Sequence, residues 1–314
     1  MAAIDLSIAL KKALDPVFAA RLIEIVQPQI TAVREDALVL ADGRNIPIVN
    51  GVPRFVASDH YAASFSFQWT LYRTTQHDEG HQTDFSQKDF ELKFGLTQAD
   101  VAGRLFLDAG CGTGRLSEIL AGWGAYVVSV DLSASVDVAH AHLAGADRVA
   151  VFQADIGALP FRPESFDFVI SSGVLHHTPD TRAYAAKLVP LVKPGGEFAI
   201  WVYSPLHAKR KEWIPLTSRL PHPAFQAWCS WIVDIARQNR QNPFLRAVRE
   251  QFPFTVYHET AARSALTLFD GYTPTYHGVH SEEEVIGWFR DFGLIDIGTN
   301  VIPTSVRGRK PAAA

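Results

Sequence analysis

The sequence predicts an α/β fold built on a mostly parallel sheet. Between residues 103 and 203, short apolar runs alternate with stretches of helical spacing, the pattern of repeated strand–helix–strand units. The first apolar run, at 105–107, ends in Asp108 and is followed by three glycines at alternate positions. A second run, at 125–130, also ends in an acid, Asp131, placed 21 residues after Gly110.

Composition narrows the class of protein. The chain has 314 residues, of which 47% are hydrophobic and 20% charged, as in globular domains, and this length suffices for one large domain with appendages. A net charge of −4 argues against a nucleic-acid partner, because proteins that bind phosphate backbones are usually basic. No run of about 18 apolar residues predicts a membrane span. With Cys111 and Cys229 as the only cysteines and no signal-peptide pattern, we expect a cytoplasmic protein without a disulfide.

Residues 108–114, Asp-Ala-Gly-Cys-Gly-Thr-Gly, predict a tight turn that leads into a helix. Glycines allow the backbone to turn sharply and to lie against a ligand where a Cβ would clash. The spacing differs from the G-x-G-x-x-G of dinucleotide-binding proteins. Asp108 stands in front of the glycines, where a carboxylate suits an α-amino cation and gives a phosphate nothing.

This stretch resembles the first motif of the class I S-adenosylmethionine-dependent methyltransferases. Other phrases of that family follow in order: Leu-Pro-Phe at 159–161, Phe-Asp-Phe-Val at 166–169, Leu-His-His at 175–177 and Lys-Pro-Gly-Gly at 193–196. The resemblance implies a Rossmann-like seven-stranded mixed sheet flanked by helices, with S-adenosyl-L-methionine as cofactor. An Asn/Asp-Pro-Pro-Tyr phrase, typical of nucleobase amino-methyltransferases, is absent after the fourth strand.

The resemblance also implies which residues hold the cofactor. Asp108 and the glycine turn would hold the methionine part, Asp131 both ribose hydroxyls and Asp155 the adenine amine. An acidic helix cap before Ser133 is the alternative role of Asp131. Gln68 and Trp69 belong to an F-x-x-Q-W phrase found in lid helices of similar enzymes, with plain core packing as the alternative. The predicted cofactor-binding set is Asp108, Ala109, Gly110, Gly112, Gly114, Asp131, Leu132, Asp155, Ile156, Ser172, Gln68 and Trp69.

Histidines supply the candidates on the acceptor side. His176 and His177 follow the fourth strand, where the family's loop passes the sulfonium end of the cofactor, so either could act as a base or shape the acceptor site; a structural role is the alternative. The polar ends of further side chains cluster in the short loop that ends the long insertion at 204–278. The predicted catalytic set is His176, His177, Tyr276, His277 and His280. We predict no metal site: His77 and His81 lie four residues apart, but Gly80 argues against a helix, and residues 73–88 predict a solvated loop.

Pattern changes divide the chain into six segments. We predict helices and short strands over 1–58, resembling a zinc-ribbon-like segment without its cysteines, and aromatic lid helices with a loop over 59–102. The cofactor-binding core follows at 103–203. Residues 204–278, called the cap below, predict helices that cover the acceptor; a dimerisation element or extra core is the alternative. The last helix and two antiparallel strands, ending at 304, occupy 279–306, and 307–314 predict a disordered tail.

The predicted function is methyl transfer to a small-molecule acceptor. The aromatic residues of the cap favour an apolar, aromatic or prenyl-like natural-product metabolite. The alternatives are a tRNA or protein methyltransferase, and a protein on the same fold that binds S-adenosylmethionine without methylating. The sequence leaves formation of a homo-oligomer open.

Overall fold

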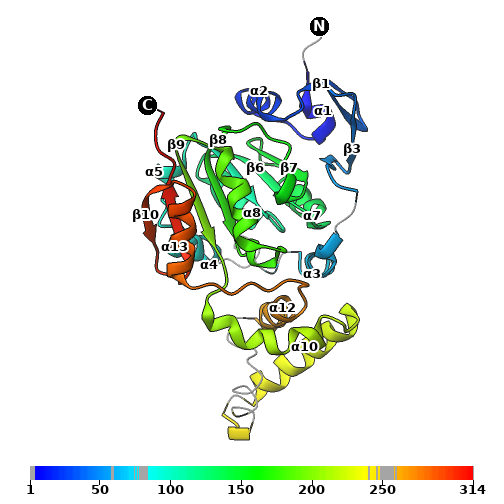
Figure 1. Ribbon diagram of the computed structural model, residues 1–314. Coiled ribbons are helices and arrows are strands. Elements are labelled where there is room, and N and C mark those ends of the chain that lie inside the picture. Colours follow the sequence, from blue (N-terminus) through cyan, green and yellow to red (C-terminus); the bar gives the residue numbers. More distant parts are fainter. Residues whose placement is uncertain are drawn as a thin grey trace.

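The computed structural model describes residues 4–57, 60–73, 75, 77, 84–239, 241–244, 247, 258 and 260–313. Its centre is a seven-stranded sheet with the order β10-β11-β9-β8-β5-β6-β7 (Figure 1). The five parallel strands are β5 (Leu105–Ala109), β6 (Tyr126–Asp131), β7 (Val149–Gln153), β8 (Phe166–Ser172) and β9 (Val192–Trp201). β11 (Ser305–Arg309) runs antiparallel to β9, and β10 (Ile295–Thr299) antiparallel to β11. The predicted Rossmann-like mixed sheet is therefore confirmed.

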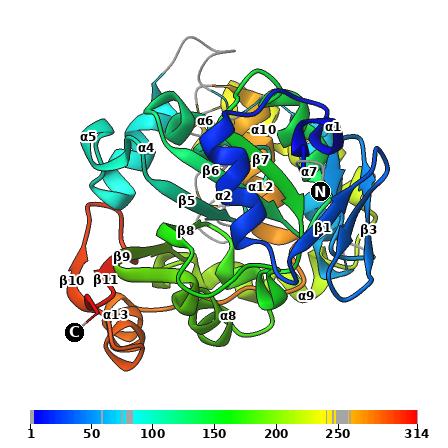
Figure 2. The same ribbon diagram turned by 90° about the horizontal axis from the view of Figure 1, so that it is seen from above.

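Helices cover both faces of this sheet (Figure 2). One face carries α4 (Phe85–Phe94), α5 (Gln98–Val101), α6 (Arg115–Gly122) and α7 (Ser135–His142). The other carries α2 (Pro16–Ile25), α8 (Thr181–Leu188) and α13 (Glu282–Asp291). Every residue of β5 is buried, as expected for a central parallel strand covered on both sides. The carboxyl end of β5 therefore has a rigid position from which the glycine turn starts.

The N-terminal segment adds α1 (Leu6–Leu10) and a small antiparallel sheet. Its strands are β1 (Ile30–Val33), β2 (Ala37–Leu40), β3 (Asn45–Val49) and β4 (Val52–Pro53). This sheet lies beside the β7 edge of the main sheet (Figure 1). Arg54 joins the two, since its guanidinium donates to Gln153 Oε1 at 3.0 Å and to Asp137 Oδ1 at 2.6 Å.

Two helical groups lie at the end of the main sheet where the parallel strands stop (Figure 1). The first is η1 (His60–Ala62) with α3 (Ala63–Leu71), the predicted lid helix. The second is the cap, with η6 (Pro205–Glu212), α9 (Ile214–Thr217), α10 (His222–Gln238) and α12 (Ala261–Tyr272). α10 and α12 share a buried cluster that includes Phe225, Cys229 and Phe269. The sequence also predicts a cap helix over 243–251, and most of that stretch lies outside the described residues.

Short 3₁₀ turns complete the core: η3 (Ile156–Ala158), η4 (Leu175–His177) and η5 (Val189–Leu191). α13 begins at Glu282, because the Ser281 hydroxyl caps it by accepting from the Glu284 amide at 3.2 Å.

The predicted position of the last strand is wrong. The last strand occupies Ser305–Arg309 rather than 300–304, so residues 307–309 belong to the sheet and not to a disordered tail. Two basic residues of the predicted tail are ion-paired to neighbouring strands, Arg307 with Glu197 of β9 and Arg309 with Asp296 of β10. The strand starts late because Thr304 takes a left-handed conformation (φ 61°) at the end of the preceding turn.

Candidate active site

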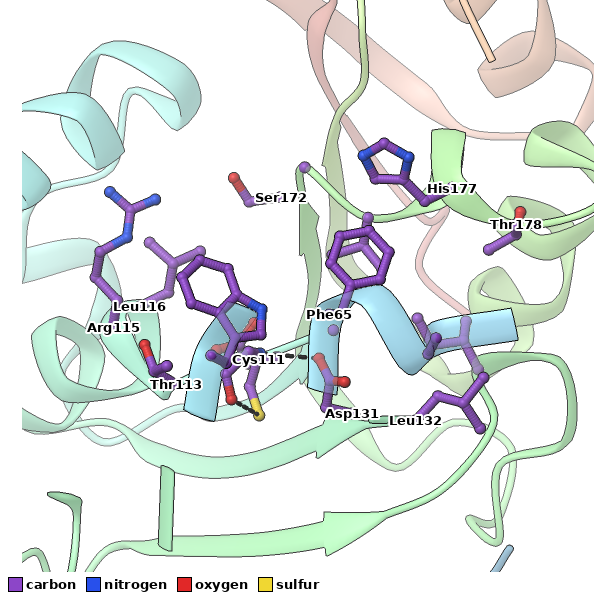
Figure 3. A pocket seen from close by; sticks show the side chains of 18 of the residues that line it. Phe65, Cys111, Thr113, Arg115, Leu116, Asp131, Leu132, Ser172, His177 and Thr178 are labelled. Atoms are coloured by element: carbon purple, nitrogen blue, oxygen red, sulfur yellow. Dashed lines mark hydrogen bonds between the residues drawn. The ribbon is translucent and has the colours of Figure 1, made fainter. Parts of the chain in front are cut away.

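A pocket opens where β5, β6 and β8 end, beneath α3 (Figure 3). One wall is the turn after β5 and the start of α6, from Asp108 to Leu116. A second wall comes from the ends of neighbouring strands and the loops after them; its members are Asp131, Leu132, Asp155, Ile156, Ser172, Gly173, Val174, His177, Thr178 and Trp201. The cover is made by Tyr61, Ala62, Phe65 and Trp69, and Asp270 reaches the pocket from α12.

The glycine turn has no room for side chains at two places. Gly110 has φ 95°, and a Cβ there would lie 2.3 Å from Val174 Cγ2. Gly114 has φ 87°, and a Cβ there would lie 2.7 Å from Leu143 Cδ1. Both conformations disfavour L-residues. Gly110 and Gly112 line the pocket, whereas Ala109 and Gly114 do not line it and shape the turn from behind.

Asp108 has one carboxylate oxygen in use and one without a partner. Ser117 Oγ donates to Oδ2 at 2.7 Å, while Oδ1 is buried and has no hydrogen-bond partner among the described residues. Burial raises the pKa of Asp108 to about 6. A buried acceptor without a donor is costly, so a cationic N–H donor bound in the pocket would satisfy this oxygen.

Asp131 and Asp155 already hold backbone donors at the mouth of the pocket. Asp131 Oδ2 accepts from the Gly112 amide at 2.9 Å, and its Oδ1 accepts from the Ser133 amide at 2.8 Å. Asp131 does not cap α7, whose N-cap is Ala134; its bonds to the two amides fix the loop between β6 and α7. Asp155 Oδ1 accepts from the Gly157 amide at 2.7 Å. A carboxylate offers about four acceptor sites, so both groups keep capacity for a ligand hydroxyl or amine.

The two predicted lid residues have different surroundings. Trp69 lines the pocket and covers Gly112, where a Cβ would lie 3.6 Å from the indole ring. Gln68 does not line the pocket, which corrects its assignment to the cofactor-binding set. It is fully buried, and its Nε2 donates to Asp270 Oδ1 at 2.9 Å. Gln68 thus connects the lid helix α3 to the cap helix α12.

Of the predicted catalytic residues, His177 is the one that lines the pocket. Its Nδ1 lies 2.9 Å from the carbonyl oxygen of Tyr276, so Nδ1 carries the proton and donates. Its Nε2 is buried and has no hydrogen-bond partner in the part of the chain that the structure describes, and burial lowers the pKa of the ring. The side chain packs beside Phe65, with 5.1 Å between ring centroids (Figure 3). A neutral imidazole with an available lone pair is the form that a general base needs.

The other predicted catalytic residues lie outside the pocket lining. His176 is fully buried, and its ring stacks on that of Tyr203 with 3.7 Å between ring centroids. Its Nδ1 accepts from the Tyr203 amide. Tyr276 contributes its carbonyl oxygen to His177 and packs its ring on Tyr61. His277 lies behind His177, with 6.1 Å between ring centroids.

His280 is engaged in packing between helices. Its Nδ1 lies 3.0 Å from Glu284 Oε1, and its Nε2 lies 3.0 Å from Thr181 Oγ1. Both ring nitrogens are thus used to join α13 to α8, so the structure does not support an acceptor-side role for this residue.

Sequence reasoning missed several pocket residues. Arg115 supplies a positive charge to the lining and pairs with Asp89 at 3.5 Å; its position directly after the last glycine could have identified it. Asp270 accepts from Gln68 and from Tyr203 Oη, the latter at 3.2 Å. Asp270 opens the Asp-x-x-x-Pro-x-Tyr phrase at 270–276, but that phrase does not predict its contacts, because its partners come from distant parts of the chain.

His77 is not in a solvated position, which corrects the loop prediction at this residue. Its side chain is 2% exposed. Its Nδ1 lies 2.8 Å from Glu118 Oε2 and its Nε2 lies 3.0 Å from Thr113 Oγ1, in the glycine turn. His81 lies outside the described residues.

Part of this chain is similar to known proteins. Residues 107–200 match the family model described as a methyltransferase domain. A demethylmenaquinone methyltransferase of Clavibacter sepedonicus is 41% identical over 34% of this chain and 44% of its own length. A ubiquinone biosynthesis O-methyltransferase of Thiobacillus denitrificans is 39% identical over 39% of this chain and 53% of its own length. A solved S-adenosylmethionine dependent methyltransferase from Mesorhizobium loti is 31% identical over 36% of this chain and 51% of its own length, with a TM-score of 0.32.

Residues 107–200 thus form a methyltransferase domain, and the seven-stranded mixed sheet is the one expected from the resemblance to class I S-adenosylmethionine-dependent methyltransferases. The chain spans about half the length of the curated relatives it matches. S-adenosyl-L-methionine is the cofactor of this class, and the pocket fits it in two respects: the unpaired Oδ1 of Asp108 suits its α-ammonium group, and the glycine turn permits close approach. Within the described part of the chain, no helix has the length and apolar character needed to cross a membrane.

Proposed function

We propose that this chain transfers the methyl group of S-adenosyl-L-methionine to a small-molecule acceptor. One observation carries the proposal: a single pocket brings the carboxylates of Asp108, Asp131 and Asp155 together with the neutral His177 and with Asp270. The carboxylates suit the hydrogen-bond donors of the cofactor. His177 and Asp270 are then left to face a second molecule.

Each holding residue has a role that follows from its contacts. Asp108 accepts from the α-ammonium group through its unpaired oxygen, and Arg115 attracts the carboxylate of the methionine part. Asp131 accepts from ribose hydroxyls, and Asp155 from the adenine amine. When bound, the cofactor supplies a methyl group on a positively charged sulfur, so the protein contributes mainly alignment and exclusion of water.

His177 accepts the proton that the acceptor loses. Because Nδ1–H is held by the Tyr276 carbonyl, the lone pair is on Nε2. A hydroxyl or amine of the acceptor gives up its proton to Nε2 as its oxygen or nitrogen becomes methylated, and the proton later leaves to solvent. Burial keeps His177 neutral at pH 7 because it lowers the pKa of the ring.

The favoured acceptor is an apolar, aromatic or prenyl-like metabolite. Four aromatic side chains line the pocket, namely Tyr61, Phe65, Trp69 and Trp201. The similar proteins named above are described for ubiquinone biosynthesis and for demethylmenaquinone, which are quinone names. Planar rings pack well against such side chains, which supports an acceptor of this class.

Calorimetric titration with S-adenosylmethionine and S-adenosylhomocysteine tests the cofactor half of the proposal. We expect micromolar binding by the wild type and loss of binding in Asp131→Asn, with Asp291→Asn, an exposed acid on α13, as the matched control. Absence of binding by the wild type, also when candidate acceptors are present, would contradict the proposal.

Mass spectrometry of acceptor mixtures tests the transfer half. We expect phenols, quinols or prenylated phenols to gain one methyl group. In His177→Gln, kcat should fall about 10²–10⁴-fold with unchanged S-adenosylhomocysteine affinity. Binding without transfer to any small molecule would favour a non-methylating protein, and methylation of bulk tRNA would favour the nucleic-acid alternative.

A further inference from the structure

A second group of polar side chains lies beside the cofactor turn, outside the pocket. Glu118 of α6 stands between two histidines: His77 Nδ1 lies 2.8 Å from its Oε2, and His142 Nε2, from the end of α7, lies 3.1 Å from its Oε1. The two imidazole rings are in contact, with 3.8 Å between centroids. Three separate segments therefore present one nitrogen, one carboxylate and one nitrogen to the same small volume.

The separations suit a metal ion. Bonds of about 2.0–2.1 Å at the tetrahedral angle place ligand atoms about 3.3 Å apart. His77 Nδ1 and His142 Nε2 lie 2.8 and 3.1 Å from the two different oxygens of Glu118, and one ligand atom from each of the three residues lies within 4.8 Å of the other two.

The surroundings have two further features of metal sites. His77 Nε2 lies 3.0 Å from Thr113 Oγ1, so a metal on Nδ1 would leave the other nitrogen donating to an oriented partner, as ligating histidines do. On the opposite side, Glu118 and His142 line a surface hollow together with Gly145 and Asp147. This hollow gives an ion a way in and leaves space for a water molecule as fourth ligand.

We propose that His77, Glu118 and His142 form a binding site for a divalent transition metal ion, with Zn²⁺ as the preferred ion. Two nitrogens and one carboxylate oxygen match the ligand preference of Zn²⁺ and suit Mg²⁺ and Ca²⁺ poorly. The ion joins α6, α7 and the segment of His77 behind the glycine turn. The site is independent of the methyl-transfer proposal.

Zinc binding by the full chain tests this site directly. The protein is stripped with a chelator, desalted and titrated with Zn²⁺ by calorimetry, and Co²⁺ is added to a second sample for its visible absorption bands. We expect one Zn²⁺ per chain and a tetrahedral Co²⁺ spectrum. His142→Gln and Glu118→Gln should each weaken binding at least about 10-fold, the lower end of what loss of an outer-shell partner costs.

His140→Gln is the matched control, because His140 lies on the same helix and outside the three-residue site. It should bind Zn²⁺ like the wild type. Far-UV circular dichroism checks that each variant is folded, and two variants on different helices guard against a local folding defect. Lack of Zn²⁺ uptake by the wild type would overturn the proposal and leave a hydrogen-bonded contact. Uptake that neither Glu118→Gln nor His142→Gln weakens would overturn it as well.

Discussion

Replacing Asp108 with asparagine should stabilise the ligand-free fold and weaken cofactor binding. Burial raises the pKa of this carboxyl from 3.8 to about 6. Below pH 3.8 the carboxyl is protonated in both the folded and the unfolded chain. As pH rises from 3.8 to about 6, the unfolded chain loses this proton before the folded chain does, so the free energy of unfolding falls. Well above about pH 6 the carboxyl is ionised in both states and the free energy of unfolding falls no further.

The size of the effect follows from the shift. With about 1.36 kcal/mol per pKa unit, the ionised carboxylate costs about 1.6 kcal/mol at pH 5 and about 3 kcal/mol at pH 8. Asparagine avoids this cost and still offers an oxygen to Ser117. The free energy of unfolding of Asp108→Asn, relative to wild type, should therefore rise by about 1.4 kcal/mol between pH 5 and pH 8.

Urea denaturation at the two pH values, without ligand, measures this difference. Asp100→Asn is the contrasting control, because hydrogen bonds from Thr97 lower the pKa of that exposed carboxyl and the variant should lose stability. In calorimetry, Asp108→Asn should bind S-adenosylhomocysteine about 10–100-fold more weakly, since a hydrogen bond to a charged group is lost. A variant that is less stable than wild type, with no gain from pH 5 to pH 8, would refute the reasoning.

Three further predictions concern the turn, the base and the cap. Gly110→Ala should lose cofactor binding and unfold at a lower urea concentration, because its Cβ meets Val174 at 2.3 Å; Gly103→Ala, with φ 76° but open space, should show the smaller effect of strain alone. The rate of methyl transfer should stay constant as pH falls through 6.5 and drop only further down, since the pKa of His177 is lowered, and His177→Gln should remove that drop from the pH profile. Asp270→Ala should raise the acceptor KM more than the cofactor Kd in steady-state assays, because it frees the lid from the cap; equal changes in both would contradict this role.

Local patterns predicted much of the fold. The helices and short strands predicted over 1–58 are present as α1, α2 and β1–β4, and each depends on neighbours within a few residues. The acids at the ends of β5 and β6 were found for the same reason, since a parallel strand that ends in a carboxylate is visible in the sequence.

The parts that were missed depend on distant contacts. Gln68 was assigned to the cofactor, but its partner Asp270 lies 202 residues further along the chain. His77 is buried by groups from α6 and from the glycine turn, so a polar segment without periodicity hid a buried side chain. The position of the last strand is set by its pairing with β9, which lies far earlier in the chain. The basic composition of 307–310 gives no indication of this pairing. The cofactor and acceptor roles of the pocket residues stay predictions for the experiments above.

The carboxylate of Asp270 limits how this protein can be recombined with its relatives. It accepts from Gln68 of α3 and from Tyr203 just after β9, so three segments that flank or close the core converge on one side chain. A chimera that takes the cap alone from another methyltransferase would leave two buried donors without an acceptor, at about 1–3 kcal/mol each. A chimera designed to exchange the acceptor preference must therefore replace residues 60–73, the end of β9 and the cap together.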